Sequence, residues 1–126
     1  MRSRTRAAPS RFSFERDGVG MIREISVQEL KARRDRGEKP LVLDVREGWE
    51  LQLASIPDVL HVPMNQIQAR LGEIRRDGEV IVMCHAGGRS MRVAHFLANQ
   101  GFTDVANLSG GISAWSEAVD ATVPRY

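Results

Sequence analysis

The sequence predicts an α/β fold, in which a central parallel sheet of about five strands carries helices on both faces. Short aliphatic runs, typical of strands buried on both sides, alternate along the chain with segments whose apolar residues recur at helical spacing. This alternation indicates a parallel sheet, because the chain must cross a face of the sheet between two parallel strands. The length of 126 residues and the 42% of hydrophobic residues fit one domain with its own core.

Five segments are expected to form the strands. They are rich in aliphatic and β-branched residues, and turn-forming or helix-starting residues follow them. In chain order they are residues 22–25, 41–45, 60–62, 80–83 and 104–108. Asp44 places a charge in the second of these strands, where it would be costly to bury alone.

Helix signals begin directly after the first strand. Ser26 and Glu29 match a capping box, which predicts the start of a helix. After the second strand a short helix is expected over residues 47–53, with Trp49 and Leu53 as its packing residues.

Three further helices are expected in the rest of the chain. Pro63 suits a first helical turn, and apolar residues at helical spacing predict a core-facing helix through about residue 76. Those apolar residues are Ile67, Leu71 and Ile74. The next helix opens at Arg89 and is stopped by Gly101, and the last spans 112–118 after a flexible turn at 109–111, with Trp115 facing inward.

The stretch from residue 79 to 101 reads as a strand, a tight loop and a helix. Cys84, the only cysteine in the protein, falls at the carboxyl end of its strand, where ligands bind in open parallel sheets. Four residues without a bulky apolar side chain follow, namely His85, Ala86, Gly87 and Gly88. Arg89 and Ser90 then open the helix.

The geometry of this loop predicts a reactive thiolate. N–H groups at a helix N-terminus point outward, and the helix dipole adds partial positive charge there. The two glycines allow several N–H groups to converge on one anion. A lone cysteine after a strand is more often a small buried hydrophobe, but the Gly-Gly and Arg-Ser pairs favour the nucleophile. We therefore expect a lowered pKa for Cys84 and an anionic substrate.

Three ordered motifs resemble those of the rhodanese-like domain family. CHAGGRS, residues 84–90, resembles the active-site loop of rhodanese-type sulfurtransferases, which has Cys, four loop residues, Arg and a small hydroxyl or apolar residue. LVLDVREGWELQLASIP, residues 41–57, is similar to the second-strand segment of the family, and GFTDVANLSGGISAW, residues 101–115, is similar to its C-terminal motif. Where the family usually has His-Ile-Pro-Gly-Ala, this chain has SIPDV, residues 55–59. The resemblance covers about residues 22–115.

The resemblance implies a single-domain sulfurtransferase with the three-layer rhodanese-like fold. Cys84 would attack the outer sulfur of thiosulfate or of a persulfide donor and carry that sulfur as a persulfide. Cyanide, a small thiol or a thiol-bearing protein would then accept it. No cofactor is implied.

The resemblance also assigns roles around the nucleophile. The loop from His85 to Ser90 would bind the substrate through its N–H groups, with the His85 side chain either reaching the substrate or facing solvent. Arg89 would either orient the anionic donor or brace the loop against an acidic neighbour. Ser90 is expected to start the helix rather than to react. Asp44 and Arg46 would form a structural framework beside the loop.

Other functional classes share parts of this pattern. Cysteine phosphatases and arsenate reductases also place Cys and Arg around an anion-binding loop. The phosphatases with the rhodanese fold have five residues between Cys and Arg, whereas this chain has four, which makes a smaller cradle that suits sulfur better than phosphate. Non-catalytic rhodanese-like modules, which bind partners, commonly lack the cysteine.

The net charge of +2 is unevenly distributed along the chain. Residues 1–20 hold five Arg against Glu15 and Asp17, and the remaining residues are nearly neutral. This basic segment lacks the apolar core of a signal peptide, so we expect a disordered tail, with a transit peptide and an over-long start as the two alternatives. Residues 21–119 are expected to form the domain, and residues 120–126 a loose C-terminal tail.

Residue counts restrict the class of protein further. One cysteine excludes an internal disulfide and a multi-cysteine metal site, and the three histidines have no metal-ligand spacing, so no metal is expected. No apolar run is long enough to cross a membrane. We expect a cytoplasmic protein that binds neither membranes nor nucleic acids.

Overall fold

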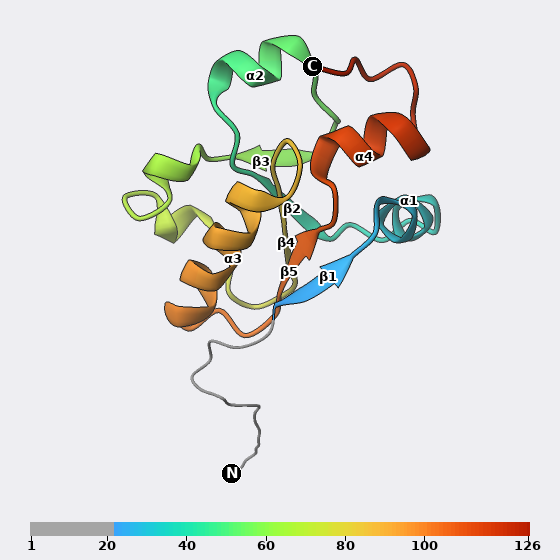
Figure 1. Cartoon of the computed structure of the whole chain (residues 1–126). Coiled ribbons are helices and arrows are strands. Elements are labelled where there is room, and N and C mark those ends of the chain that lie inside the picture. Colours follow the sequence, from blue (N-terminus) through green and yellow to red (C-terminus); the bar gives the residue numbers. More distant parts are fainter. Residues whose placement is uncertain (1–21) are drawn as a thin grey trace.

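The computed structural model describes residues 22–126, so the basic segment 1–20 lies outside the described residues. Five strands form one parallel sheet in the order β1-β5-β4-β2-β3 (Figure 1). They are β1 Arg23–Ile25, β2 Leu41–Asp44, β3 Val59–His61, β4 Val80–Met83 and β5 Val105–Leu108. The predicted α/β fold is confirmed, and β4, which leads into the Cys84 loop, lies at the centre of the sheet.

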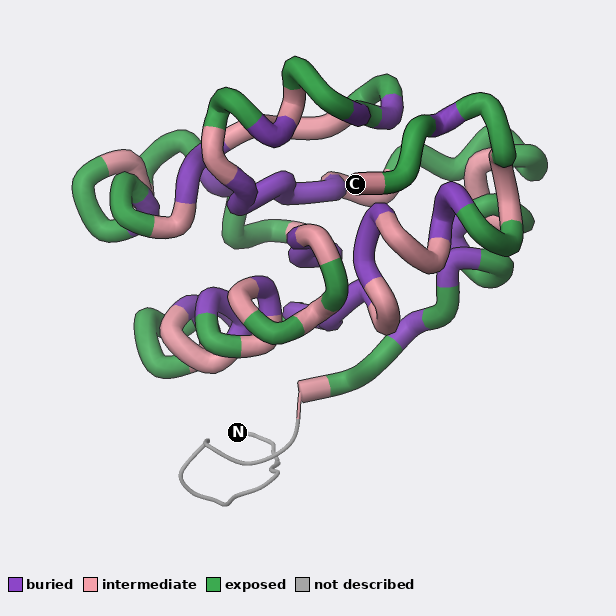
Figure 2. Tube along the Cα trace, turned by 45° about the horizontal axis from the view of Figure 1, so that its top comes forward, coloured by how far each residue is buried: buried purple, intermediate pink, exposed green. Residues whose placement is uncertain are grey.

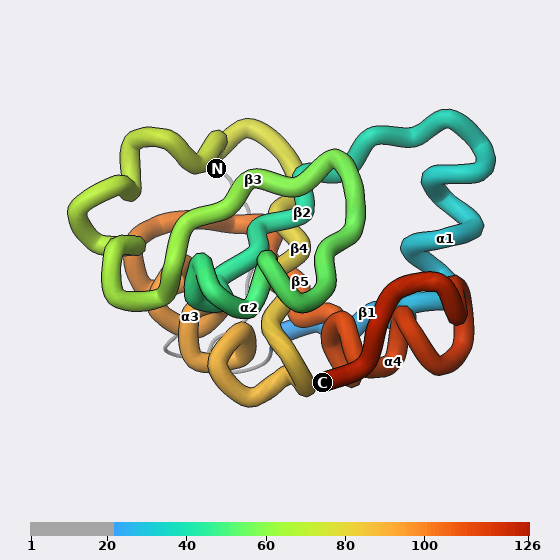
Figure 3. Tube along the Cα trace, turned by 90° about the horizontal axis from the view of Figure 1, so that it is seen from above, coloured from blue at the N-terminus to red at the C-terminus, as the bar shows by residue number. Residues whose placement is uncertain are grey.

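Helices cover both faces of this sheet. Helices α1 (Val27–Asp35) and α4 (Gly111–Ala118) pack together on one face, and α3 (Gly88–Asn99) lies on the other (Figure 3). Because side chains alternate along a strand, Ile81 and Met83 enter the core under α1 and α4, whereas Val82 and Cys84 enter the core under α3. Buried positions accordingly concentrate along the strands in the middle of the molecule (Figure 2).

The first helix begins as its capping pattern predicts. The Ser26 hydroxyl accepts a hydrogen bond from the N–H of Glu29 at 3.0 Å, which satisfies one of the free N–H groups of the first turn. Val27 and Leu30 form the buried side of α1. This helix therefore contacts the sheet through a short apolar side, while its partly buried Arg33 forms an ion pair with Glu79, the residue before β4.

The segment after Pro63 differs from the prediction. Two short 3₁₀ helices, η1 (Met64–Gln66) and η2 (Leu71–Glu73), replace the single helix expected through residue 76. Ile67 and Ile74 are nevertheless buried. Apolar spacings of three and four residues fit successive 3₁₀ turns as well as an α-helix, so the spacing alone could not separate the two.

Helix α2 (Gly48–Leu53) forms where it was expected but buries a different side. The predicted packing residues are wrong, because Trp49 is 63% exposed and Leu53 is 47% exposed. The buried residue of the helix is Glu50. An ion pair rather than an apolar stripe directs this helix, because the Glu50 carboxylate meets Arg89.

The C-terminal segment also departs from the prediction of a loose tail. Val123 is buried, and its carbonyl accepts a hydrogen bond from the Ser116 hydroxyl of α4 at 2.5 Å. The last residue, Tyr126, packs against the same core. Residues 120–126 therefore run over α4 and bring the chain end to the carboxyl ends of the strands, beside α2 (Figure 1).

Candidate active site

Cys84 lies directly after β4, at the carboxyl end of the central strand. It is 1% exposed, and it belongs to the core under α3. The loop turns at Gly87, which has a left-handed φ of 114° and serves as the N-cap of α3. Glycine adopts this conformation without the steric cost that a side chain would bring, so the loop can fold tightly back over the sulfur.

Hydrogen-bond donors converge on the Cys84 sulfur. The N–H of Gly87 donates to Sγ at 3.0 Å, and the Ser90 hydroxyl lies 3.3 Å from Sγ. Burial by itself raises the pKa of the thiol, but hydrogen bonds from the Ser90 hydroxyl and from the N–H groups of Ser90, Gly87 and Ala86 outweigh it. The net result is a lowered Cys84 pKa, as the loop pattern predicted.

Ser90 has more acceptors than its single proton can serve. Its hydroxyl lies 2.5 Å from Asn107 Oδ1 and 3.2 Å from the Gly87 carbonyl, in addition to Cys84 Sγ. A hydroxyl donates one proton and rotates freely, so it can turn toward the sulfur when the thiolate forms. The sequence predicted Ser90 only as a helix-start residue, and the structure adds a contact between its hydroxyl and the Cys84 sulfur.

Arg89 is braced by an acidic neighbour, one of the two roles that the sequence left open. Its guanidinium makes a bidentate pair with Glu50, at 2.7 and 2.8 Å. Hydrogen bonds from Arg89 lower the pKa of the Glu50 carboxyl to about 2, and Glu50 in turn raises the pKa of Arg89. The pair joins α2 to the start of α3 and fixes the Arg89 side chain at the rim of the loop.

Asp44 and Arg46 form a second ion pair, which is completely buried. Arg46 donates to both carboxylate oxygens of Asp44, with Nη2 to Oδ2 at 2.7 Å and Nε to Oδ1 at 2.9 Å. Its remaining nitrogen donates to the carbonyl of Ala54 at 3.0 Å. All three guanidinium nitrogens are thus paired, which is the condition under which a buried charge is tolerated.

The turn before α4 packs against the nucleophile loop. The N–H of Ile112 donates to the Cys84 carbonyl, and the N–H of Ser113 donates to the His85 carbonyl, each at 3.0 Å. Gly111 permits this approach, because a Cβ at its position would lie 2.3 Å from the Cys84 carbonyl oxygen. The turn was expected to be flexible, but its two glycines instead allow close docking at positive φ.

A family model described as the Rhodanese-like domain matches residues 26–118, which include both ion pairs and the Cys84 loop. The chain belongs to the rhodanese-like domain family.

Two relatives and one solved structure illustrate the similarity. A protein named sulfurtransferase from Allochromatium vinosum is 38% identical over 96 residues, which cover 76% of this chain and 90% of that protein. A putative sulfur carrier protein of Bacillus subtilis is 35% identical over 79% of this chain and 54% of its own length. The crystal structure of a rhodanese-like domain protein from Staphylococcus aureus has a TM-score of 0.73 at 27% identity, covering 83% of this chain and 99% of that one.

Several site residues of this rhodanese-like domain were not predicted. Glu50, Asn107, Gly111 and Tyr126 all contact the loop or the residues that hold it. Asn107 carries a signal in the sequence, since it is a polar residue within an otherwise aliphatic strand. The other three show no such signal, because their partners are brought together only by folding.

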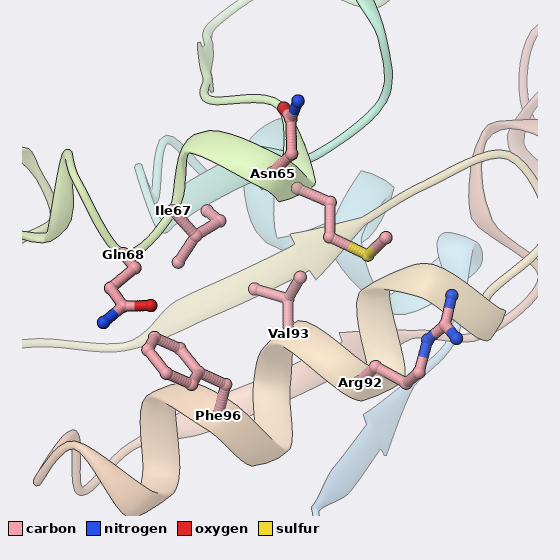
Figure 4. A pocket seen from close by; sticks show the side chains of 7 residues that line it. Asn65, Ile67, Gln68, Arg92, Val93 and Phe96 are labelled. Atoms are coloured by element: carbon pink, nitrogen blue, oxygen red, sulfur yellow. The ribbon is translucent and has the colours of Figure 1, made fainter.

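An apolar pocket of about 360 Å³ lies between α3 and η1 of the rhodanese-like domain (Figure 4). Met64, Ile67, Val93 and Phe96 supply its apolar lining. Asn65, Gln68 and Arg92 add polar groups. No residue from 84 to 90 lines this pocket, so it is separate from the hydrogen-bond donors around Cys84.

Within residues 22–126 no helix has both the length and the apolar character needed to cross a membrane.

Proposed function

We propose that this protein is a sulfurtransferase that moves sulfane sulfur from thiosulfate or a persulfide donor to a thiophilic acceptor. The observation that carries the proposal is the buried Cys84 sulfur, whose pKa is lowered by converging N–H and O–H donors. Relatives named sulfurtransferase and sulfur carrier support the same class of reaction.

The first half-reaction loads the cysteine. The Cys84 thiolate attacks the outer sulfur of thiosulfate, an S–S bond forms at Sγ, and the S–S bond of the donor breaks. Sulfite leaves with the electron pair of the broken bond, so no external oxidant is needed. Loop N–H groups between His85 and Ser90 hold the transferred sulfur and the departing oxyanion.

The second half-reaction unloads the cysteine. A nucleophilic acceptor attacks the outer persulfide sulfur, the S–S bond breaks, and the Cys84 thiolate is restored. Because the chain contains no second cysteine, the acceptor must be an outside molecule. Cyanide, a small thiol or a thiol-bearing protein each has the required chemistry.

The other site residues bind the donor or support the loop. The loop from His85 to Ser90 surrounds the reacting sulfur, and the exposed Ala86 and Gly88 leave its outer side open to small molecules. Arg89 stays charged and oriented through Glu50, and it supplies positive charge for an anionic donor. The buried Asp44–Arg46 pair supports the strand end beside this loop and takes no part in the chemistry.

Mass spectrometry of the intact protein tests the proposal. Thiosulfate should add one sulfur atom to the protein, and cyanide should remove it with release of thiocyanate. Cys84→Ser should neither gain sulfur nor produce thiocyanate. A Cys84→Ser protein that forms thiocyanate at the wild-type rate would exclude this mechanism.

A further inference from the structure

The C-terminal segment brings one side chain to the active site. Tyr126 lies beyond residues 26–118, the range that the family model matches. We propose that Tyr126 is a positioning residue for sulfur transfer, which holds the His85 ring and the Glu50–Arg89 pair in place for the anionic donor. This inference rests on the function proposed above.

The ring of Tyr126 stacks on His85. The two ring centroids are 4.1 Å apart, and the ring planes differ by 8°. Figure 3 shows the chain end beside the loop that joins β4 to α3. The contact thus joins the C-terminal segment to the residue immediately after the nucleophile.

The hydroxyl of Tyr126 bridges the two ion pairs of the site. It donates to Glu50 Oε1 at 2.9 Å and accepts from Arg46 Nη1 at 3.0 Å. Glu50 Oε1 also accepts a hydrogen bond from Nη2 of Arg89 at 2.8 Å. Burial raises the pKa of Tyr126, so the hydroxyl keeps its proton near neutral pH and remains a donor. One phenol therefore connects the buried framework pair to the pair that orients Arg89.

The His85 side chain depends on this stacking for its orientation. Its Nε2 atom is buried and has no hydrogen-bond partner among residues 22–126. Since no hydrogen bond at Nε2 holds the ring, the flat contact with Tyr126 restrains it.

The segment that carries Tyr126 is anchored independently of the loop. Val123 is buried in the core under α1 and α4, and Ser116 of α4 donates to its carbonyl. Replacing the Tyr126 side chain therefore leaves the anchor of the segment in place. A substitution at Tyr126 can change the active site without releasing the segment that carries it.

The expected kinetic signature follows from these contacts. Tyr126 acts on His85, Glu50 and Arg46, whereas the donors to Cys84 Sγ come from Gly87 and Ser90, so the reactivity of the thiolate should not change. Donor binding should weaken, because the orientations of Arg89 and His85 become less restricted. The KM for the donor should therefore rise while kcat changes little.

Two substitutions separate the hydroxyl from the ring. Tyr126→Phe keeps the stacking but loses both hydroxyl hydrogen bonds, and we expect its KM for thiosulfate to rise about threefold. Tyr126→Ala loses the stacking as well, and we expect its KM to rise roughly tenfold or more. In both variants kcat and the pH midpoint of Cys84 alkylation should stay at the wild-type values.

Arg125→Ala is the matched control from the same segment. The Arg125 side chain is 68% exposed and forms a 3.5 Å ion pair with the exposed Glu117. Its KM, kcat and melting temperature should equal those of the wild type. In a Glu50→Gln background, Tyr126→Phe should raise KM by less than it does in the wild type, because the two residues act through one contact.

Nuclear magnetic resonance of His85 provides a readout that is independent of the reaction. The Tyr126 ring should shift the His85 ring protons upfield, and Tyr126→Ala should remove the shift. An inactive wild type that keeps this shift would overturn the sulfurtransferase function, and with it the role of Tyr126 in transfer. An active wild type whose Tyr126→Ala variant keeps the wild-type KM, or loses activity only in proportion to unfolded protein, would overturn the positioning role alone.

Discussion

The pKa of Cys84 is decided by contacts with a few individual atoms. The sulfur is buried, and burial opposes a charged form. The N–H of Gly87 and the hydroxyl of Ser90 reverse this tendency, because a thiolate accepts their hydrogen bonds better than a thiol does. The reactivity of the nucleophile is thus a property of its immediate donors rather than of exposure.

Ser90→Ala tests this balance. Loss of the hydroxyl removes one donor to the thiolate, so the Cys84 pKa should rise and sulfur loading at neutral pH should slow. The rate of alkylation by iodoacetamide as a function of pH measures the shift. Ser113→Ala is the control, because Ser113 donates to the His85 carbonyl through its backbone N–H, which the substitution keeps. An unchanged midpoint in Ser90→Ala would show that the backbone donors alone set the pKa.

The start of α4 supports the loop that carries Cys84. The first N–H groups of α4 donate to the carbonyls of Cys84 and His85 instead of to solvent. Gly110 and Gly111, both at positive φ, let the helix start approach that closely. The start of one helix therefore braces the loop that leads into another.

Gly111→Ala should disrupt this docking. The added methyl group would lie 2.3 Å from the Cys84 carbonyl oxygen and 2.6 Å from that of His85, on a backbone at φ 58°. We expect the free energy of unfolding to fall by more than about 2 kcal/mol, measured by urea denaturation. Gly48→Ala in α2 meets no atom within 4 Å and should change stability by less than about 1 kcal/mol. Equal effects of the two substitutions would contradict the docking argument.

The length of the loop between β4 and α3 is expected to set the preference for sulfur. Inserting one small residue between Ala86 and Gly87 would widen the ring of N–H groups around Cys84. Thiocyanate production should fall and tungstate binding should improve, because the site then fits a larger oxyanion. The same insertion after Asp77, in an exposed turn, should change neither quantity. If the loop insertion also leaves thiocyanate production and tungstate binding unchanged, the phosphatase alternative regains support.

At the scale of the whole molecule, two ion pairs connect helices and strands at the carboxyl end of the sheet. Arg89 and Glu50 join α3 to α2, and Asp44 and Arg46 lock the end of β2. Tyr126 connects both pairs to the end of the chain. The stability of the folded protein should therefore depend on pH in the range where Glu50 takes up its proton.

Glu50→Gln tests this dependence. The Glu50 pKa falls from 4.5 to about 2 on folding, so its stabilising contribution is complete above pH 4.5 and is lost as the pH falls toward 2. At neutral pH the substitution should lower the free energy of unfolding by on the order of 3 kcal/mol. The difference from the wild type should shrink below pH 4.5 and vanish near pH 2. Denaturant unfolding at a series of pH values measures it.

Glu73→Gln is the control for the charge change. Glu73 pairs with Arg70 on the surface, and exposed pairs contribute little, so the stability should be nearly unchanged at every pH. If the wild type and Glu50→Gln lose stability in parallel down to pH 2, the Glu50–Arg89 pair does not supply the stabilisation assigned to it.

The sequence alone determined the order of the strands along the chain, the α-helices outside residues 63–76 and the place of the candidate nucleophile. Aliphatic runs and helical spacing are local patterns, and they predicted all five strands to within one or two residues at each end. The capping pattern at Ser26 and the strand, loop and helix around Cys84 are equally local. Such features can be read from neighbouring residues because short-range sterics and hydrogen bonding decide them.

The tertiary structure decided the rest of the site. Trp49 could not be recognised as exposed without knowing that Glu50 turns inward to meet Arg89. Asn107 reaches Ser90 because β5 lies beside β4 in the sheet, and Tyr126 reaches His85 because residues 120–126 run back over α4. These contacts join segments far apart in the chain, so they exist only once the sheet order and the packing of the helices have placed both partners at the same end of the molecule.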